Sequence, residues 1–464
     1  MAGRGAVLAG VDVGTTNCKV GVYTTDGAVV AARRRPTPSD PTDLVAGVLA
    51  DLRRCIDDGG REPLAVGITG VAEGGVALGR DLRPAGPLLW WHDSHAEDAA
   101  RRLAEEVGRV ELFETTGVDV SAKTTLATWL WLRDSESGAL KNMRSWVGAP
   151  ELVATGLCGR PITDRTLAGR SGAFDQRAGR YDENLLALAG VRPAQLPDPC
   201  GLAPATGPAL PAGTPVVVAG HDHLVAGYAA GAREPGDVVD SLGTAEAVVT
   251  ICATPPAGSA AGTGMSWNHT AGGDGWAMVS GFPHSGRLVD WLRSLCAGQT
   301  YAELDALAGS VRDRPTGIVV QPYLAGRAAP APDPDRRLSI HGLDRRHGLA
   351  DMLVAVLEGA CFHGRWMAER QARYSGTALA DVAVLGGPSR GRAWMDLKAH
   401  VLPGRVRKVA DVDAACAGAA LLAGRAIGLS APVLGSEVLP RDDALADRYD
   451  TIYRDFLSHA EVAA

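Results

Sequence analysis

Hydrophobic runs divide the chain into short predicted strands, and several of these runs end in small or polar residues. The first run, at residues 8–22, reads LAGVDVGTTNCKVGV, with apolar positions before Asp12 and again after Lys19. Asp26-Gly27 then gives the signal of a tight turn. The pattern predicts two strands joined by a loop that carries a carboxylate, a glycine, two hydroxyls and an amine.

The loop residues suit the binding of a phosphate and a hydrated metal ion. Gly14 lets the backbone approach a ligand closely, and Thr15 and Thr16 offer N–H and O–H donors. Asp12 suits a hydrated Mg²⁺, because this ion keeps several waters and takes one or two carboxylates. An ordinary hairpin with a polar tip has the same pattern, and Lys19 also fits a surface lysine, so a second signal is needed.

Apolar residues at helical spacing predict helices between the strands. The spacing favours helices over residues 43–57 and 349–373, and a run of small residues favours a tightly packed helix over 414–426. Strands and helices that alternate along the chain are typical of an α/β protein with a layered sheet.

A second hairpin of the same kind occurs about one domain further along the chain. Two apolar runs flank Gly243-Thr244, which matches the first tip, although Ser241-Leu242 stands where the first loop has Asp-Val. The repeat indicates a duplicated fold whose two halves face a common ligand. A boundary near residue 233 then predicts domains of residues 1–232 and 233–464.

Composition limits the class of protein. The chain has 464 residues, 46% of them hydrophobic and 21% charged, and a net charge of −7, which is ordinary for a soluble globular enzyme. No basic block indicates a nucleic-acid binder, and no long apolar run indicates a signal peptide or a membrane span. The eight scattered cysteines are typical of reduced thiols. We therefore expect a cytoplasmic protein with no nucleic-acid or membrane partner.

Six motifs in order resemble those of the FGGY carbohydrate kinases, a branch of the actin-like and hexokinase-like ATPase superfamily. The first loop resembles the phosphate motif D-x-G-T-x-x-x-K of this family. The likeness runs from about Val7 to Leu422. The other five stretches are LPAGTPVVVAGHDHLVAGYAAGA, GDVVDSLGTAEAVV, QPYLAGRAAPAPDPDRRLSIHGL, LGGPSRGRAWMDLKAHVL and CAGAALLAG.

The resemblance implies phosphorylation of a sugar or polyol hydroxyl by ATP and Mg²⁺, in a cleft between two ribonuclease-H-like domains. It implies that Asp222 is the general base, and that Asp12 holds Mg²⁺ through water. Dimers are common in such kinases, so a homodimer is one expected state. The residues that it implies for ATP and phosphate binding are Gly14, Thr15, Thr16, Lys19, Gly243, Thr244, Gly286, Asp290, Gly386, Gly387 and Gly391.

The segments that select the sugar in this family depart from the family pattern here. Glu73 stands where enzymes of the xylulokinase kind have histidine, and Ala72 stands where glycerol kinases have arginine. The W-x-D-x-R segment has His95 for its arginine, and the E-R-x-P segment, which ends at Pro330 with Ala329 before it, lacks its glutamate. We expect a small neutral substrate, either a ketose such as a pentulose or a polyol such as glycerol or a tetritol. The residues expected to contact it are Glu73, Trp91, Asp93, Asp222 and His223.

Other interpretations of these residues stay open. Asp222 also suits a cap of the helix that follows it, and Gly386-Gly387 is a common strand-to-helix turn. His221 and His223 resemble a metal pair, but H-x-H with no third ligand nearby is more typical of packing or substrate hydrogen bonding. For the whole chain, the alternative is a non-catalytic regulatory protein of the same fold that binds nucleotide and sugar. The presence of both Asp12 and Asp222 argues against it.

Overall fold

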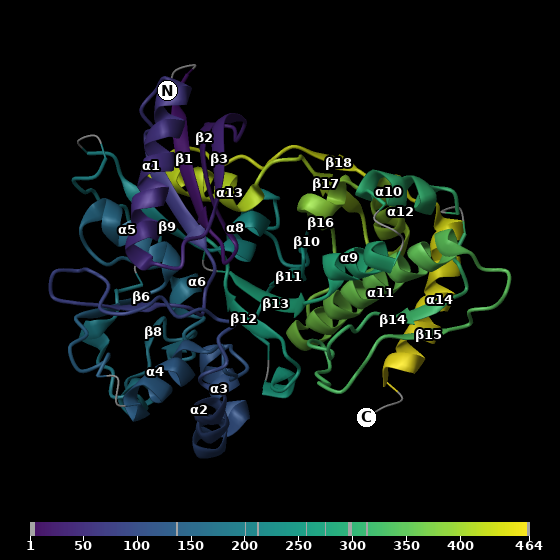
Figure 1. The fold of residues 1–464 in the computed structure, drawn as a ribbon, viewed down its shortest axis with the longest axis horizontal. Helices are drawn as coiled ribbons and strands as arrows, with labels where there is room; N and C mark the ends of the chain where they lie inside the picture. The colour runs from purple at the N-terminus through teal and green to yellow at the C-terminus, as the bar shows by residue number, and fades with distance from the viewer. Residues whose placement is uncertain are drawn as a thin grey trace. The chain divides into compact units, whose positions relative to one another are not determined.

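The computed structural model of the chain describes residues 5–135, 138–199, 201–210, 213–256, 258–273, 275–295, 299–311 and 314–461 (Figure 1). The chain folds into two compact units, each with its own β-sheet and helices. The fold is therefore mixed α/β with two sheet-containing domains, as predicted. The first unit comprises Met1–Gly231, Ser266–Ala277 and Val412–Leu434, and the second comprises Ala232–Met265, Met278–Asp411 and Gly435–Ala464.

The sheet of the first unit has the strand order β3-β2-β1-β4-β9. The β1–β2 and β2–β3 pairs are antiparallel, whereas β1–β4 and β4–β9 are parallel. Every residue of β1 is buried, as expected for a strand with both faces covered by helices. The strands are β1 (Val7–Val13), β2 (Asn17–Thr24), β3 (Val29–Pro36), β4 (Val66–Gly70) and β9 (Val216–His221).

Helices cover this sheet, and pairs of short strands form separate two-stranded sheets. Helix α1 shows how the sequence sets such an element: Asp40 caps its first turn, Gly60 ends it in the left-handed conformation, and its apolar stripe packs in the core beneath β1. The remaining elements are α1 (Pro41–Gly59), β5 (Val76–Leu78), α2 (Glu97–Leu103), the π-helix η1 (Ala104–Gly108), α3 (Arg109–Thr116), α4 (Thr125–Asp134), β6 (Ser145–Val147), α5 (Ala149–Cys158), α6 (Arg165–Ala168), β7 (Phe174–Asp175), β8 (Arg180–Tyr181), α7 (Glu183–Leu188), η2 (Pro193–Gln195), α8 (Asp222–Ala229), β12 (Ser266–His269) and α13 (Ala414–Ala426).

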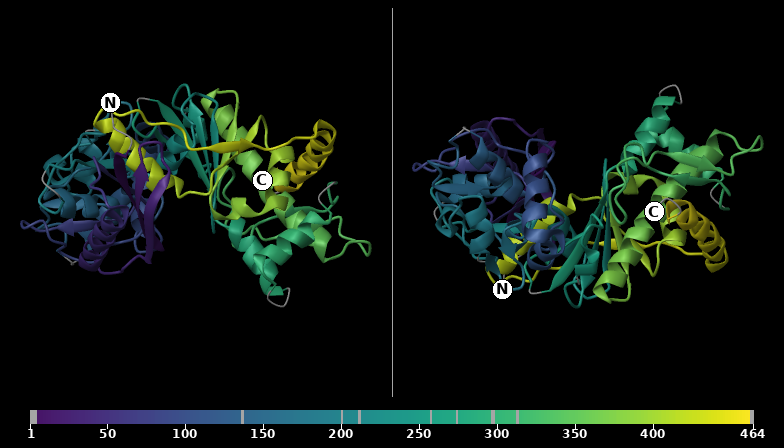
Figure 2. Two further views of the ribbon diagram at one scale, coloured as in Figure 1. Left: turned by 90° about the horizontal axis from the view of Figure 1, so that it is seen from above. Right: turned by 90° about the horizontal axis from the view of Figure 1, so that it is seen from below.

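Helix α13 packs on β1, β4 and β9 of this sheet although it comes from the far end of the chain (Figure 2). Small residues make this approach possible on both sides of the contact. A Cβ atom on Gly10 would lie 1.9 Å from the carbonyl oxygen of Cys416, and one on Gly67 would lie 1.8 Å from that of Ala419. The two glycines therefore let the backbones of helix and strands touch.

The compact units do not follow sequence order throughout, whereas the predicted domains are the continuous ranges 1–232 and 233–464. Val412–Leu434 belongs to the first unit because α13 completes the cover of its sheet, and Ser266–Ala277 belongs there as well. In the latter segment the backbone N–H of Trp267 donates to the carbonyl of Gly117 at 2.8 Å. Both segments pack against residues that are far away in the sequence, and a division of the chain by sequence order alone does not predict such contacts.

The second unit repeats the strand order of the first. In its sheet β13, β11, β10, β16 and β17 are consecutive neighbours, with β18 beyond β17. The β10–β11 pair is antiparallel, like β1–β2, and the β10–β16 and β16–β17 pairs are parallel, like β1–β4 and β4–β9. The duplicated fold indicated by the two hairpins is therefore present.

The long helix α11 lies beside α12 and packs on β11 (Figure 1). None of the helices among the described residues is long and apolar enough to cross a lipid bilayer. The elements of the second unit are β10 (Val238–Leu242), β11 (Glu246–Cys252), η3 (Gly258–Ala260), β13 (Trp276–Phe282), α9 (Ser285–Leu295), α10 (Tyr301–Gly309), β14 (Val319–Gln321), β15 (Ser339–His341), α11 (Leu349–Ser375), β16 (Val382–Leu385), η4 (Gly387–Arg390), α12 (Arg392–Val401), β17 (Val406–Val409), β18 (Ser436–Val438) and α14 (Asp443–Glu461).

We predict that Gly67→Ala lowers the free energy of unfolding by about 3 kcal/mol, because the new methyl group forces α13 away from β4. Urea unfolding followed by circular dichroism measures the change. Gly86→Ala is the matched control, since nothing lies within 4 Å of a Cβ atom at that position. Equal stability of the two variants would contradict the close approach of α13.

Candidate active site

Three parallel neighbours of the first sheet end at acidic residues. Asp12 is the last residue but one of β1, Glu73 follows β4 by three residues, and Asp222 comes directly after β9. Parallel strands end at one edge of a sheet, so these acids belong to the same edge, where α/β proteins bind their ligands. The Thr69 hydroxyl donates to the carbonyl of Gly220 at 2.6 Å and ties β4 to β9 there.

In the first loop, Lys19 lies opposite Asp12 on the paired strand and bridges two carboxylates. Its Nζ lies 3.0 Å from Asp12 Oδ2 and 2.7 Å from Asp413 Oδ2. Burial lowers the pKa of Lys19, but the negative charges of Asp12 and Asp413 outweigh burial and raise it above its ordinary value. Lys19 is therefore a partly buried, charged group and not a free surface lysine.

Asp12 is 4% exposed, and burial raises the pKa of its carboxyl to about 7 although Lys19 acts in the opposite direction. Its Oδ1 atom is buried and has no hydrogen-bond partner. Among the described residues, no cluster of three or more His, Cys, Asp or Glu side chains is arranged to hold a metal ion. The donor set thus fits a hydrated cation that takes a single carboxylate, and does not fit an all-protein metal cage.

The tip of the first loop meets one of the residues predicted for the sugar side. The Trp91 Nε1–H donates to the Thr15 hydroxyl at 2.9 Å, and the ammonium group of Lys123 lies 5.9 Å from the centre of the Trp91 ring. The Gly14 carbonyl accepts from the Thr37 hydroxyl at 2.7 Å, and the Thr16 carbonyl accepts from the Thr37 N–H at 3.0 Å. Trp91 and the tip of the first loop therefore belong to one cluster.

Glu73 has a φ of 65°, a left-handed conformation that residues other than glycine rarely adopt. Its Oε1 forms an ion pair with the Arg170 guanidinium, whose other terminal nitrogen donates to the hydroxyl of Ser266. Burial raises the pKa of Glu73, but the charges of Arg170 and Lys123 outweigh it and leave the pKa below its ordinary value. Glu73 is thus an ionised carboxylate held at a fixed place.

Arg170 was not predicted from the sequence. It lies just after the short helix α6, in a polar segment interrupted by glycines, where no periodic pattern distinguishes it. Its side chain is 13% exposed, and its Nε atom is buried with no hydrogen-bond partner. The only signal for it in the sequence is Glu73, a carboxylate for which no cationic partner was apparent.

Asp222 is the first residue of α8, and His221 occupies the capping position with no side-chain cap. The Asp222 Oδ1 atom accepts from the His223 N–H at 2.7 Å and lies 3.3 Å from His221 Nε2. Burial raises the pKa of Asp222, but His223 and His221 outweigh it, so the pKa stays below its ordinary value. Asp222 therefore carries an ionised carboxylate beside two imidazoles.

His221 is buried, and burial lowers its pKa to about 4, so its imidazole is neutral near pH 7. Its Nδ1 atom has no hydrogen-bond partner. The rings of His221 and His223 meet edge to face with centroids 5.5 Å apart. With no third ligand beside them among the described residues, the pair does not have the arrangement of a metal site.

Two predicted residues have other partners in the structure. One carboxylate oxygen of Asp93 accepts from the Trp90 N–H at 2.8 Å and closes a turn. In the second unit, Asp290 Oδ1 accepts from the Tyr301 hydroxyl, and Arg293 lies 3.9 Å away. His95, which replaces an expected arginine, stacks on Trp131 with centroids 5.0 Å apart.

The second unit brings its predicted glycines to the loop between β10 and β11. A Cβ atom on Gly286 would lie 2.3 Å from the carbonyl oxygen of Gly243, and the Arg287 N–H donates to the Thr244 carbonyl at 3.2 Å. Gly386 has a φ of 102°, and a Cβ atom there would lie 1.9 Å from the carbonyl oxygen of Leu242. Gly387 begins η4 and Gly391 is the residue before α12. Because these positions are glycines, the backbones of the neighbouring segments approach the loop between β10 and β11 closely, and their amide groups lie near it.

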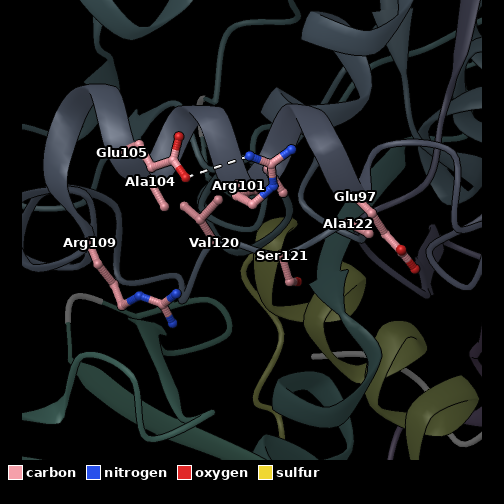
Figure 3. Close-up of a pocket in the computed structure, with 9 residues that line it drawn as sticks. Glu97, Arg101, Ala104, Glu105, Arg109, Val120, Ser121 and Ala122 are labelled. Carbon is pink, nitrogen blue, oxygen red and sulfur yellow. Dashed lines mark ion pairs between the residues drawn. The ribbon is translucent and has the colours of Figure 1, made fainter.

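A separate surface pocket of about 400 Å³ lies along α2 and η1 (Figure 3). Arg101 and Glu105 on its wall form an ion pair at 3.6 Å. None of the residues predicted for the active site lines this pocket.

Comparison with known proteins accounts for this arrangement. The N-terminal domain of the FGGY family of carbohydrate kinases matches residues 7–228, and the C-terminal domain of the same family matches residues 239–427. The chain belongs to the FGGY family of carbohydrate kinases. The resemblance in the six motifs is thereby confirmed, and the protein is a carbohydrate kinase that uses ATP as a substrate.

Relatives in this family act on different compounds. The chain is 21% identical to a gluconokinase of Bacillus subtilis (96% of this chain, 91% of the relative) and 28% identical to a xylulose kinase of Streptomyces rubiginosus (98% and 97%). It is 28% identical to a glycerol kinase of Aromatoleum aromaticum (91% and 90%). A solved xylulose kinase of Rhodospirillum rubrum superposes with a TM-score of 0.87 at 25% identity, covering 98% of each chain. The family therefore establishes sugar or polyol phosphorylation, and leaves the substrate to be argued from the site.

We predict that the stability of the wild type falls more steeply than that of His221→Gln between about pH 6.5 and pH 4. The folded pKa of His221 is about 4 against 6.5 for an unperturbed histidine, so in this range the unfolded chain binds a proton that the folded chain does not, and acid favours unfolding. Urea midpoints across this range measure the difference. His92→Gln, at an exposed histidine, is the control, and a wild-type slope in His221→Gln would contradict the prediction.

Proposed function

We propose that this kinase transfers the γ-phosphate of ATP to a hydroxyl of a small neutral ketose or polyol, with Asp222 as the general base. The observation that carries the proposal is the convergence of Asp12, Glu73 and Asp222 at the ends of the parallel strands β1, β4 and β9. One edge of one sheet thereby supplies a group for the phosphate side, a group for the sugar and a base.

The environment of Asp222 supports its role as the base. A general base has to be ionised and has to lie within hydrogen-bond reach of the hydroxyl that it deprotonates. The pKa of Asp222 lies below its ordinary value, and its Oδ1 is oriented by the His223 N–H. The carboxylate accepts the proton of the sugar hydroxyl as the oxygen attacks the γ-phosphate, and it returns that proton to solvent after transfer.

The charge of the sugar side favours a neutral substrate. Glu73 and Arg170 neutralise each other, Lys123 balances the charge of Asp222, and His221 is uncharged near pH 7, so the group has no net charge. Such a group offers no spare positive charge to a carboxylate on the substrate, whereas it can both donate to and accept from hydroxyl groups. The unpaired Nε of Arg170 and Nδ1 of His221 match such hydroxyls, because buried polar atoms require partners. Trp91, Asp93 and His223 are assigned to the same sugar-binding group.

On the phosphate side, Asp12 would hold a hydrated Mg²⁺ through its unpartnered Oδ1. This ion, when bound with ATP, neutralises charge on the phosphates. The N–H and O–H groups of Thr15 and Thr16 donate to phosphate oxygens, Gly14 lets the backbone approach them, and Lys19 keeps the Asp12 carboxylate in place. Residues assigned to the nucleotide in the second unit are Gly243, Thr244, Gly286, Asp290, Gly386, Gly387 and Gly391.

We predict that ADP release is stimulated by a neutral ketose or polyol and not by gluconate. A coupled assay over glycerol, tetritols, pentitols, ketopentoses, ketohexoses and gluconate measures it. Turnover with gluconate alone would contradict the neutral substrate, and no turnover with any compound of the panel would contradict the proposed reaction.

With the substrate identified in this way, we predict that Asp222→Asn lowers kcat about a thousandfold while ADP still binds. Asp81→Asn, at an exposed aspartate, is the matched control; turnover retained in Asp222→Asn removes this residue as the base.

We predict that Glu73→Gln raises the KM for the sugar roughly 10- to 100-fold, because an amide accepts more weakly than a carboxylate and leaves the Arg170 charge unpaired. The affinity for ADP, measured by calorimetry, is expected to stay unchanged. Glu62→Gln, at an exposed glutamate of the same unit, controls for the loss of one negative charge. A wild-type KM in Glu73→Gln would remove this residue from the sugar site.

A further inference from the structure

The second unit contains a completely buried cation that none of the roles above uses. Lys398, on α12, has no exposed side-chain surface, and its Nζ contacts Asp240 Oδ2 and lies 2.7 Å from Glu246 Oε1. The two acids are also buried, with 2% and 0% of their side chains exposed. One ammonium group and two carboxylates therefore share a buried site.

These contacts join the elements that carry the second phosphate loop. Asp240 lies on β10, three residues before Gly243, and Glu246 is the first residue of β11. The other oxygen of Glu246 accepts from the Ser285 hydroxyl at 2.7 Å, and Ser285 begins α9 next to Gly286. The ammonium group thus holds both strands of the hairpin and, through Glu246, the start of α9.

The same cation also joins this hairpin to the segment between β16 and α12. Lys398 belongs to α12, which follows the loop that contains Gly386 and Gly391. Gly386 lies against the carbonyl of Leu242, and Gly286 lies against the carbonyl of Gly243. A Cβ atom at either glycine would clash with that carbonyl oxygen. A displacement of the hairpin by a fraction of an ångström would therefore be passed directly to each of these loops.

Stability alone gives a weak reason for such a cluster, because well-packed apolar residues often replace a buried ion pair without loss of stability. A fixed geometry is a better reason. Burial raises the pKa of Asp240 to about 8, while Lys398 keeps that of Glu246 below its ordinary value despite burial. The Lys398 ammonium group donates to both Asp240 and Glu246, and such charge-assisted hydrogen bonds are directed.

We propose that Lys398 is a positioning residue that, through Asp240 and Glu246, sets the geometry of the Gly243-Thr244 loop for the phosphates of a nucleoside triphosphate. The inference rests on the proposed function in one respect, the assignment of that loop to the phosphates. It adds a buried residue that touches neither substrate and acts through the hairpin.

The test uses the full-length chain and a variant that removes all three charges at similar volume, Lys398→Met with Asp240→Asn and Glu246→Gln. Removal of Lys398 alone would leave unpaired buried acids and endanger folding. Glu246→Gln alone is the second variant, since it leaves a Lys398–Asp240 pair. Calorimetry measures the Kd for ADP without sugar, and steady-state assays measure the KM for the sugar.

The matched control is Gln371→Leu. Gln371 is a buried residue of α11. It accepts from the Thr250 hydroxyl at 2.5 Å and donates to Ser280 Oγ at 2.6 Å. Both partners lie on strands of the same sheet as Asp240, but away from the Gly243-Thr244 loop. Its loss is expected to lower the melting temperature without changing the Kd for ADP. It therefore separates general loosening of the unit from misplacement of the loop.

We expect the triple variant to raise the Kd for ADP about tenfold, and Glu246→Gln to raise it less, with the KM for the sugar unchanged. A wild-type Kd in the triple variant, or an equal rise in Gln371→Leu, would overturn the positioning role. The proposed function is tested separately by wild-type turnover. If the wild type binds ADP but phosphorylates no sugar, the proposed function fails, while the change in Kd still decides the role of Lys398. If the wild type binds no ADP, the proposed function and the role of Lys398 both fail.

Discussion

The close approach of α13 to β1 and β4 is the constraint on which the first unit depends. Without a side chain at Gly10 and Gly67, the helix backbone rests on the strands, and its N-cap residue Asp413 comes within 2.7 Å of Lys19. Lys19 in turn holds Asp12. Because a close-packed interior transmits displacements, the position of the Asp12 carboxylate is linked to the packing of a helix that the chain forms about four hundred residues later.

Each acid of the site is accompanied by a group of opposite or adjustable charge, and the kind of partner matches the role proposed for that acid. Glu73 has a permanent partner in Arg170, which keeps it ionised and fixed. Asp222 has imidazoles beside it, which stabilise its charge and leave an oxygen available. Asp12 keeps one unpartnered oxygen. These differences follow from general electrostatics, since burial without a partner disfavours the charged form.

Local patterns predicted the elements well and the long-range contacts poorly. Helical spacing predicted residues 349–373 and 414–426 as helices, and the structure has them as Leu349–Ser375 and Ala414–Ala426. The two Gly-Thr hairpins predicted the duplicated sheet, because their pattern lies within a few adjacent residues. The packing of α13 in the first unit was not predicted, and Arg170 and Lys398 were missed. Each of these depends on a partner more than ninety residues away, which no local pattern contains.

The left-handed backbone of Glu73 limits how this enzyme can be redesigned or can diverge. Asparagine, aspartate and histidine adopt a φ of 65° more readily than most residues, whereas a β-branched side chain would be strained there. A β-branched residue at this position would therefore require a different turn after β4. The path of the backbone thus restricts which side chains single substitutions can place at this position without strain.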